Sequence, residues 1–145
     1  MTKIQAEKWF EYQNIVTFAD TNVVGNVYFA HYFDWQGKCR DTLLREIYPE
    51  FVEDMRRGFS LITEFAHVDF LQEAALFEVV IVRMRVTDLT RTRIELEFEY
   101  IRQADGNLLA KGRQAVIWLN AQHRPSLMPD ALYDGTLRFF TFSDF

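Results

Sequence analysis

One long helical repeat near the N-terminus constrains the fold of this chain most strongly. Apolar residues recur at spacings of three and four between about residues 28 and 47, at Tyr32, Trp35, Cys39, Leu43 and Ile47. The sequence Tyr48-Pro49 ends this pattern, because proline biases the residue before it away from the helical region. About 20 helical residues would span roughly 30 Å at 1.5 Å per residue. This length is large for a chain of 145 residues, so we expect a central helix on which a sheet packs.

Strand patterns lie on both sides of this helix. Residues 9–18 are rich in aromatic and β-branched side chains, and a short second helical piece is expected at 50–57. Four further strands are predicted, at 60–71, 76–87, 93–101 and 107–119. The links 88–90 and 104–106 are short, which favours an antiparallel meander. The tail, from about 129 to 145, indicates a short helix followed by a loose aromatic end.

The third of these later strands shows the clearest alternation. Ile94, Leu96, Phe98 and Tyr100 alternate with Glu95, Glu97 and Glu99, so the apolar and acidic side chains lie on opposite faces. A period of two is typical of a sheet with one buried face. We expect the glutamates to face solvent or to pair with Arg83 and Arg85 across neighbouring strands.

The order strand, long helix, four strands predicts an α+β protein of one domain, residues 1–145. A five-stranded antiparallel sheet wrapped around a long central helix is the hot-dog fold. One such domain leaves an edge of its sheet uncovered, so a dimer is the smallest assembly that we expect.

Charge and cysteine content narrow the classes of partner. The net charge is −5, and no run of Lys and Arg forms a basic patch, so nucleic acid is not expected as a partner. Cys39 is the single cysteine, and the three histidines are scattered without the spacing of a metal site. No apolar run reaches membrane-spanning length and no signal peptide is recognised, so the expected location is the cytoplasm.

Aromatic residues make up 16% of the chain, and 14 of them are phenylalanines. This surplus suits an apolar ligand cavity or a subunit interface. An aromatic-rich core explains it equally well.

The stretch before the helix, FADTNVVGNVYFAHY at residues 18–32, is the strongest candidate for a functional loop. The start of a helix presents unpaired amides and a partial positive charge, which would polarise a bound carbonyl group and stabilise an oxyanion. The amides near Phe29 and Ala30 are the candidates, and Gly25 would let the backbone approach a ligand closely. The alternative is structural, because Asp20 and Asn22 could merely cap the helix or close a turn.

This stretch resembles the signature of hot-dog thioesterases of the 4-hydroxybenzoyl-CoA type, which is roughly D-x-D-x-x-G-x-V-x-x-x-x-Y. Asp20, Gly25, Val27 and Tyr32 match it. Asn22 stands where those enzymes carry the Asp that acts as nucleophile or general base. Asn at this position with an Arg later on the helix, here Arg40, is similar to the thioesterases that accompany iterative enediyne polyketide synthases. The resemblance covers nearly the whole chain.

The resemblance implies roles for several side chains. Asn22 cannot titrate, so it would hold the thioester carbonyl or the attacking water through hydrogen bonds. Arg40 would polarise the carbonyl or hold a carboxylate product, although it could also be a surface residue paired with Asp41 or Glu46. Arg40 lies about 11 residues beyond the expected helix start, roughly 16 Å along the axis. It would therefore reach the loop only if the loop runs back along the helix or if a second subunit completes the site.

Three further side chains, Thr63, Tyr32 and Glu64, are candidates for the same site. The resemblance suggests that Thr63 contributes a hydroxyl, and Tyr32 is either a site residue or a core tyrosine. Glu64 interrupts an apolar alternation, so it is a buried acid with a raised pKa or the partner of a salt bridge. His31 and Cys39 lie about 12 Å apart along a helix, too far for a catalytic pair, and Cys39 is expected to pack inertly.

The function that the resemblance implies is hydrolysis of a long polyene β-keto or β-hydroxy acyl thioester. The acyl chain would be bound to the acyl carrier protein of an enediyne polyketide synthase, and a released β-keto acid can lose CO₂ by itself. The implied assembly is a homotetramer, a dimer of dimers, and no metal or cofactor is needed. Candidates for carrier binding are Arg56–Arg57 and the pair Arg91 and Arg93. Two alternatives stay open: an acyl-CoA thioesterase, and an acyl-binding domain that lost catalysis.

Overall fold

The computed structural model describes residues 4–6, 8–23, 25–140 and 142–144. Residues 1–3, 7, 24, 141 and 145, which belong to the predicted domain, lie outside the described residues. The elements are β1 (Ile4–Ala6), β2 (Phe10–Ile15), η1 (Phe18–Asp20), α1 (His31–Ile47), α2 (Phe51–Arg56), β3 (Ser60–Phe70), β4 (Val79–Leu89), β5 (Arg93–Arg102), β6 (Leu108–Leu119), α3 (Asp130–Phe139) and β7 (Phe142–Asp144). Each strand and helix predicted above is present, with its ends moved by a few residues.

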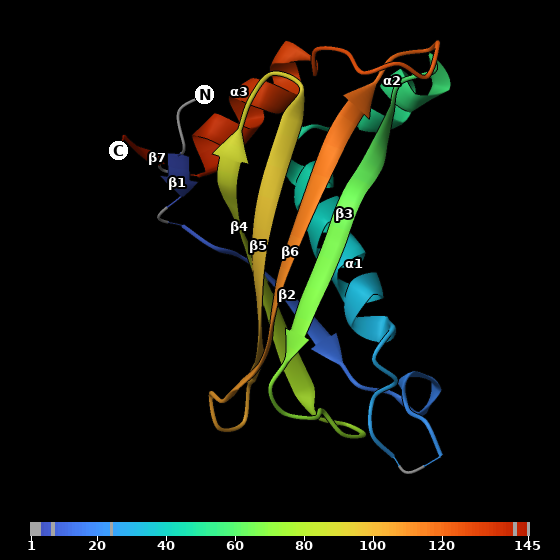
Figure 1. The fold of residues 1–145 in the computed structure, drawn as a ribbon, viewed down its shortest axis with the longest axis vertical. Helices are drawn as coiled ribbons and strands as arrows, with labels where there is room; N and C mark the ends of the chain where they lie inside the picture. Colours follow the sequence, from blue (N-terminus) through green and yellow to red (C-terminus); the bar gives the residue numbers. More distant parts are fainter. Residues whose placement is uncertain (1–3, 7, 24, 141, 145) are drawn as a thin grey trace.

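Five strands form the main antiparallel sheet, in the order β2-β4-β5-β6-β3 (Figure 1). Strands β4, β5 and β6 form the predicted meander. Strand β3 lies outside this meander and pairs with β6 at the far edge of the sheet. The alternation of a strand shows which of its faces is buried but not which strand lies beside it, so the sequence does not predict this pairing.

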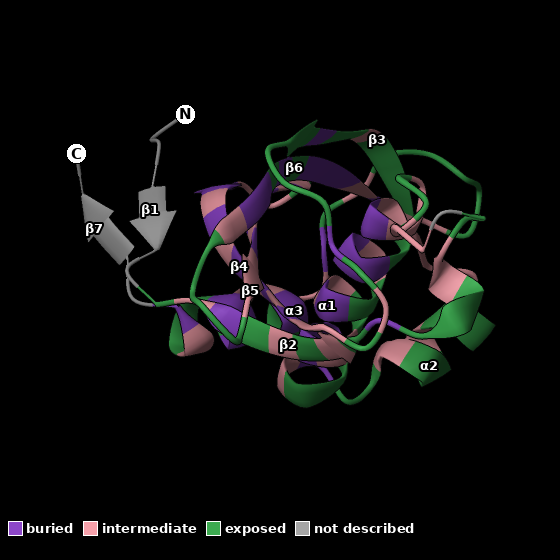
Figure 2. Cartoon of the chain, turned by 90° about the horizontal axis from the view of Figure 1, so that it is seen from below, coloured by how far each residue is buried: buried purple, intermediate pink, exposed green. Residues whose placement is uncertain are grey.

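Helix α1 lies within the curve of this sheet (Figure 2). It spans 17 residues and begins at His31, three residues later than the repeat indicated, because residues 28–30 form turns. Its buried side chains are Tyr32, Trp35, Gln36, Cys39, Leu43 and Leu44. They pack against the inner side chains of β4, β5 and β6, and this layer is the core of the protein.

The C-terminal segment differs from the expected loose end. Helix α3 packs against α1, and a Cβ at Gly135 would lie 2.5 Å from the Ile47 carbonyl oxygen, so only glycine allows this close approach. After α3, β7 pairs antiparallel with β1 in a separate two-stranded sheet. The tail is therefore ordered by pairing with the other end of the chain.

The outer face of the sheet carries the charge pairs that the alternation of β5 predicted. Arg83 lies opposite Glu99, and Arg85 lies opposite Glu97. The Arg85 Nε donates to Glu97 at 3.0 Å, and the Arg83 Nε donates to Glu99 at 2.8 Å. Cross-strand pairing, the role expected for these arginines, is confirmed.

Strand β3 ends the sheet, and no described strand lies beside its outer edge. Most of its residues are exposed, including Ile62 and Phe70, which are close to half exposed. A β-bulge between Thr63 and Phe65 inserts Glu64 into the ladder. An uncovered edge of this length is a surface on which another chain could add a strand.

Candidate active site

The loop before α1 is closed by backbone hydrogen bonds. Asn22 donates its backbone N–H to the Asn26 carbonyl at 2.8 Å and accepts from the Gly25 N–H at 3.0 Å. Gly25 has a φ of +87°, a conformation that glycine adopts without strain. The loop is tied to the segment before β4, because the Val27 N–H donates to the Ala74 carbonyl at 3.0 Å. Asn22 is exposed and lines a surface hollow of about 830 Å³ with Gly25.

Asp20 has a structural role. Its carboxylate accepts hydrogen bonds from the backbone N–H and the hydroxyl of Thr17, at 2.9 and 3.2 Å. These bonds close the short helix η1 rather than α1, whose N-cap is Ala30 without a capping side chain. The Asp20 carbonyl also accepts from the Tyr28 N–H at 2.9 Å, so Asp20 fixes both ends of the loop.

The first turn of α1 leaves two amides available. The N–H groups of His31, Tyr32 and Phe33 donate to the carbonyls of residues 28, 29 and 30. Within the described part of the chain, the N–H groups of Phe29 and Ala30 have no hydrogen-bond acceptor. They are the amides expected to stabilise an oxyanion, and Phe29 is 57% exposed.

Tyr32 belongs to the core, but its ring also reaches a surface cavity. The residue is buried, its ring contacts Phe70 edge-on at 5.0 Å, and its carbonyl accepts from the Tyr100 hydroxyl at 2.8 Å. Burial raises the pKa of Tyr32, and a hydrogen bond with the Ala74 backbone opposes this shift. Tyr32, Phe29 and Phe70 line a cavity of about 300 Å³ between the start of α1 and the end of β3.

Arg40 lies farther along α1 and is held from two sides. Its Nε donates to the Asp41 carboxylate at 2.8 Å, and its Nη1 donates to Gln114 Oε1 on β6 at 2.9 Å. Nη2 has no acceptor among the described residues and lies beside Gly37. The predicted surface pairing with Asp41 is present, but the bond to Gln114 also directs the guanidinium towards the inner face of the sheet.

Two cavities meet at Arg40. One is a narrow apolar space of about 40 Å³ between α1, the sheet and α3. The other is a surface cavity of about 450 Å³ between α1, α2 and the start of β3. Arg40, Leu44 and Leu61 line both, so the guanidinium lies between solvent and an apolar interior.

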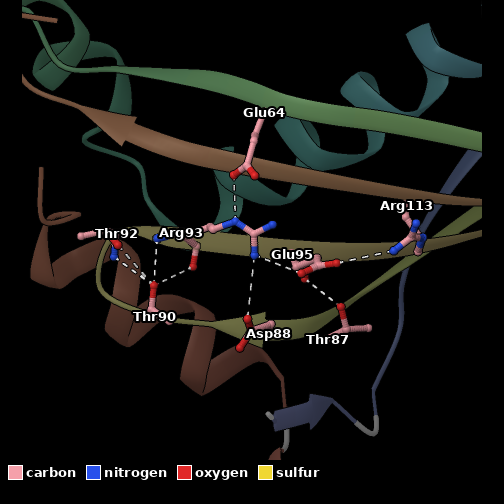
Figure 3. Close-up of polar contacts among 8 residues, drawn as sticks. All are labelled: Glu64, Thr87, Asp88, Thr90, Thr92, Arg93, Glu95 and Arg113. Atoms are coloured by element: carbon pink, nitrogen blue, oxygen red, sulfur yellow. Dashed lines mark hydrogen bonds and ion pairs between the residues drawn. The ribbon is translucent and has the colours of Figure 1, made fainter. Parts of the chain in front are cut away.

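The bulge in β3 shifts the alternation of the strand at Glu64, so Thr63 lies on the inner face and Glu64 on the outer face. Thr63 pairs with Val116, whose side chain lines the apolar cavity beside Arg40, so Thr63 belongs to the inner face. Glu64 lies on the outer face and accepts from Arg93 Nε at 2.9 Å, as Figure 3 shows. This hydrogen bond raises the pKa of Arg93. Of the two roles considered for Glu64, the structure shows the salt-bridge partner, and the bulge explains why simple alternation misplaced it.

One protomer therefore does not bring all the predicted site residues together. Asn22 and Gly25 line one hollow, Phe29 and Tyr32 line another, and Arg40 with Thr63 lies farther along the β3 side. The distance from His31 to Arg40 along α1 remains roughly 13 Å at the helical rise. The loop does not run back along the helix, so the remaining expectation is a site that another subunit completes.

Cys39 and His31 do not form a nucleophile pair. Cys39 is fully buried, its Sγ lies 3.7 Å from the Val82 carbonyl oxygen, and burial raises the pKa of its thiol to about 12. His31 is partly exposed and contacts Asp34 at 3.0 Å. Cys39 is inert packing, as expected.

Gln36 and Gln114 were missed by the sequence reasoning. Both are buried, and both contact the residues around Arg40 through hydrogen bonds. The sequence does carry a signal for them: each is a polar residue on an otherwise apolar inner face, beside Trp35 on the helix or between Gly112 and Val116 on the last long strand.

Among the described residues, no group of three or more His, Cys, Asp or Glu side chains could hold a metal ion. The helices of the described segments are all too short or too polar to cross a membrane.

The family model of the thioesterase-like superfamily matches residues 16–135. The chain belongs to this superfamily, and its five-stranded antiparallel sheet with α1 is the hot-dog fold of thioesterases. Comparison with the curated proteins finds no match.

Among solved structures, the chain is similar to the dynemicin thioesterase, an enediyne enzyme whose crystal structures show induced-fit and allosteric effects upon polyene binding. The two are 38% identical, with a TM-score of 0.85 over 91% of this chain and 97% of that one. A 1,4-dihydroxy-2-naphthoyl-CoA thioesterase from Synechocystis is 19% identical, with a TM-score of 0.78 over 89% and 96%. A Staphylococcus aureus protein in complex with CoA is 18% identical, with a TM-score of 0.85 over 96% and 85%. The last two show the fold alone.

Proposed function

We propose that this protein hydrolyses a long polyene acyl thioester carried on the phosphopantetheine arm of an acyl carrier protein of an enediyne polyketide synthase. The acyl group would be a β-keto or β-hydroxy chain. The observation that carries the proposal is the 38% identity with the dynemicin thioesterase over nearly the full length of both chains. That protein binds a polyene, and the superfamily supports thioester hydrolysis as the reaction.

The start of α1 supports the chemistry. A thioester carbonyl directed at the N–H groups of Phe29 and Ala30 would meet unpaired donors and the positive end of the helix dipole. Asn22 would orient the carbonyl or the attacking water from the exposed loop. Such a site lacks a strong base, but a thiolate leaves readily, and orientation can contribute about 7–11 kcal/mol in favourable cases.

Arg40 and Thr63 would complete the site from a second copy of the chain. Thr63 lies on β3, and Arg40 lines a cavity with the start of β3, whereas Asn22 lies in the loop before the start of α1. Two copies joined along β3 would place the loop of one copy near Arg40 of the other. We propose a homotetramer built from two such dimers.

The cavities around Arg40 offer room for an apolar substrate. The surface cavity could admit the arm, and the apolar space behind Arg40, Leu44 and Leu61 could take part of the acyl chain. A β-keto acid product needs no further residue to lose CO₂, since its own cyclic transition state suffices.

The arginines considered for carrier binding already have acidic partners. Arg56 pairs with Glu53, and Arg57 lies 3.7 Å from Asp54. Arg91 pairs with Asp130, and Arg93 contacts Glu64 and Glu95. A carrier protein would have to compete with these pairs, so they are weak candidates for its docking.

Co-expression with an enediyne polyketide synthase tests the proposal. A carrier-bound polyene should accumulate without this protein and be released with it, as mass spectrometry of the products and of the carrier would show. Identical products in both cultures would end the proposal. Thiol release should then be measured with the purified carrier protein loaded with the acyl chain and with the CoA thioester of the same chain. Faster release from the carrier indicates a carrier-specific enzyme, and faster release from CoA indicates a CoA thioesterase. Absence of thiol from every substrate would favour an acyl-binding domain.

A further inference from the structure

A chain of buried hydrogen bonds connects Arg40 to the edge strand. Arg40 Nη1 donates to Gln114 Oε1 at 2.9 Å, Gln114 Nε2 donates to Gln36 Oε1 at 3.2 Å, and Gln36 Nε2 donates to the His67 carbonyl at 3.1 Å. Gln36 is completely buried and Gln114 is 4% exposed. The bonds cross from α1 to β6, back to α1 and then to β3.

The two ends of this chain fix the direction of every bond in it. An arginine can only donate, so Gln114 must present its oxygen to Arg40 and its NH₂ group to Gln36. The His67 carbonyl can only accept, so Gln36 must present its NH₂ group to β3. Neither amide can turn over without placing two donors or two acceptors against each other in the core.

The neighbouring residues leave no room for another arrangement. A Cβ at Gly112 would lie 2.5 Å from Gln36 Nε2, so a glycine at this position of β6 makes space for the amide. Tyr100 lies beside Gln36 and donates its hydroxyl to the Tyr32 carbonyl at 2.8 Å. The polar chain thereby also reaches the first turn of α1.

We propose that Gln114 and Gln36 are positioning residues that hold the Arg40 guanidinium in one orientation for the thioester site. The proposal rests on the function proposed above. Gln114 fixes Nη1 and Asp41 fixes Nε, and the planar guanidinium then has Nη2 left to meet a substrate oxygen. Gln36 acts on Arg40 indirectly, because its hydrogen bond with Gln114 keeps the Gln114 amide from turning over.

A double-mutant cycle tests this inference. Gln114→Met preserves most of the side-chain volume and removes both hydrogen bonds, while Arg40→Ala removes the group that is positioned. Gln114→Met should lower kcat by about tenfold to hundredfold, as expected when a charged group loses a fixed hydrogen bond, with little change in KM. In the Arg40→Ala background the same change should have no further effect on kcat. Additive losses would show that Gln114 acts through general packing and would overturn the inference.

A control variant separates positioning from loss of stability. Asp88→Asn alters another buried polar side chain, on the outer face beside Arg93. It should leave kcat near the wild-type value even if it lowers the melting temperature as much as Gln114→Met does. An equal loss of kcat in both variants would contradict a positioning role.

A second measurement does not depend on the reaction. The Nη signals of Arg40 in a ¹⁵N spectrum, assigned by their loss in Arg40→Ala, should be distinct in the wild-type protein and should merge in Gln114→Met. Unchanged Arg40 signals in Gln114→Met would refute the positioning role. A wild-type protein that releases no thiol, but shows these spectral changes, would refute the proposed function and leave the positioning intact.

Discussion

Asn22 stands where the thioesterase signature that this loop resembles has an acidic residue, and it lies on an exposed loop. Backbone hydrogen bonds from Asn22 to Asn26 and from Gly25 to Asn22 close the loop around this residue. An amide can hold a carbonyl or a water molecule without taking a proton. Under the proposed function, catalysis would then depend on orientation and on the amides at the start of α1.

The contribution of Asn22 can be measured by its removal. Asn22→Ala should lower kcat by about 10²–10³-fold if the amide donates to the developing oxyanion, the loss typical of one such donor. Asn26→Ala changes the same residue type in the same loop and should retain most activity. Steady-state thiol release gives both values. Wild-type kcat in Asn22→Ala would remove Asn22 from the site.

Cys39 allows a prediction about pH. Its pKa of about 12 in the folded protein lies above the ordinary value of 9.0, so the unfolded chain loses this proton first as pH rises. The contribution of Cys39 to stability is therefore complete below about pH 9 and declines from there towards pH 12. A disulfide reagent at pH 8 should label Cys39 only after urea unfolds the protein, and the folded enzyme should keep its activity. Rapid labelling of the folded protein would show that Cys39 is accessible.

At the scale of elements, the alternation of side chains in the sequence predicted which face of a strand is buried. The alternation of β5 correctly placed Glu97 and Glu99 on the outer face because a period of two reports a buried face directly. The pattern in β3 failed at Glu64, since one bulge residue shifts the alternation and no composition signal marks it. Arg40 and Gln114 are 74 residues apart, and only the folded sheet brings them together.

The two glycines within helices should respond oppositely to alanine. A Cβ at Gly37 would lie 4.0 Å from Arg40 Nη2, which is ordinary contact, so Gly37→Ala should raise stability by up to about 1 kcal/mol through helix propensity. A Cβ at Gly135 would collide with the Ile47 carbonyl oxygen at 2.5 Å, so Gly135→Ala should cost about 1–3 kcal/mol. Urea unfolding measures both changes. A neutral Gly135→Ala would mean that α3 can shift away from α1 freely.

At the scale of the whole molecule, the two edges of the main sheet differ. Strand β3 is 11 residues long and largely exposed, whereas β2 has six residues. A long uncovered edge favours pairing with another copy of the chain. The proposed division of the site between two copies depends on this edge.

Matched lysine substitutions distinguish the two edges. Ile62 on β3 and Ile15 on β2 are 49% and 56% exposed, so neither change should unfold the protein. Ile62→Lys should weaken assembly and lower activity, because two copies of the charge would meet at the interface. Ile15→Lys should leave both unchanged. Sedimentation velocity with an activity assay provides the comparison, and a monomeric wild-type protein would refute assembly along β3.

The bulge at Glu64 also affects how this chain should be aligned with its relatives. Thr63 and Phe65 pair with consecutive residues of β6, so they would keep their own faces if Glu64 were deleted. A one-residue gap elsewhere in β3 would exchange the inner and outer faces beyond it. If a relative lacks the bulge, its sequence should be aligned with a one-residue gap opposite Glu64, because this keeps Thr63 aligned with a residue of the inner face. A gap opposite Thr63 would instead align Glu64, an outer residue, with that inner residue.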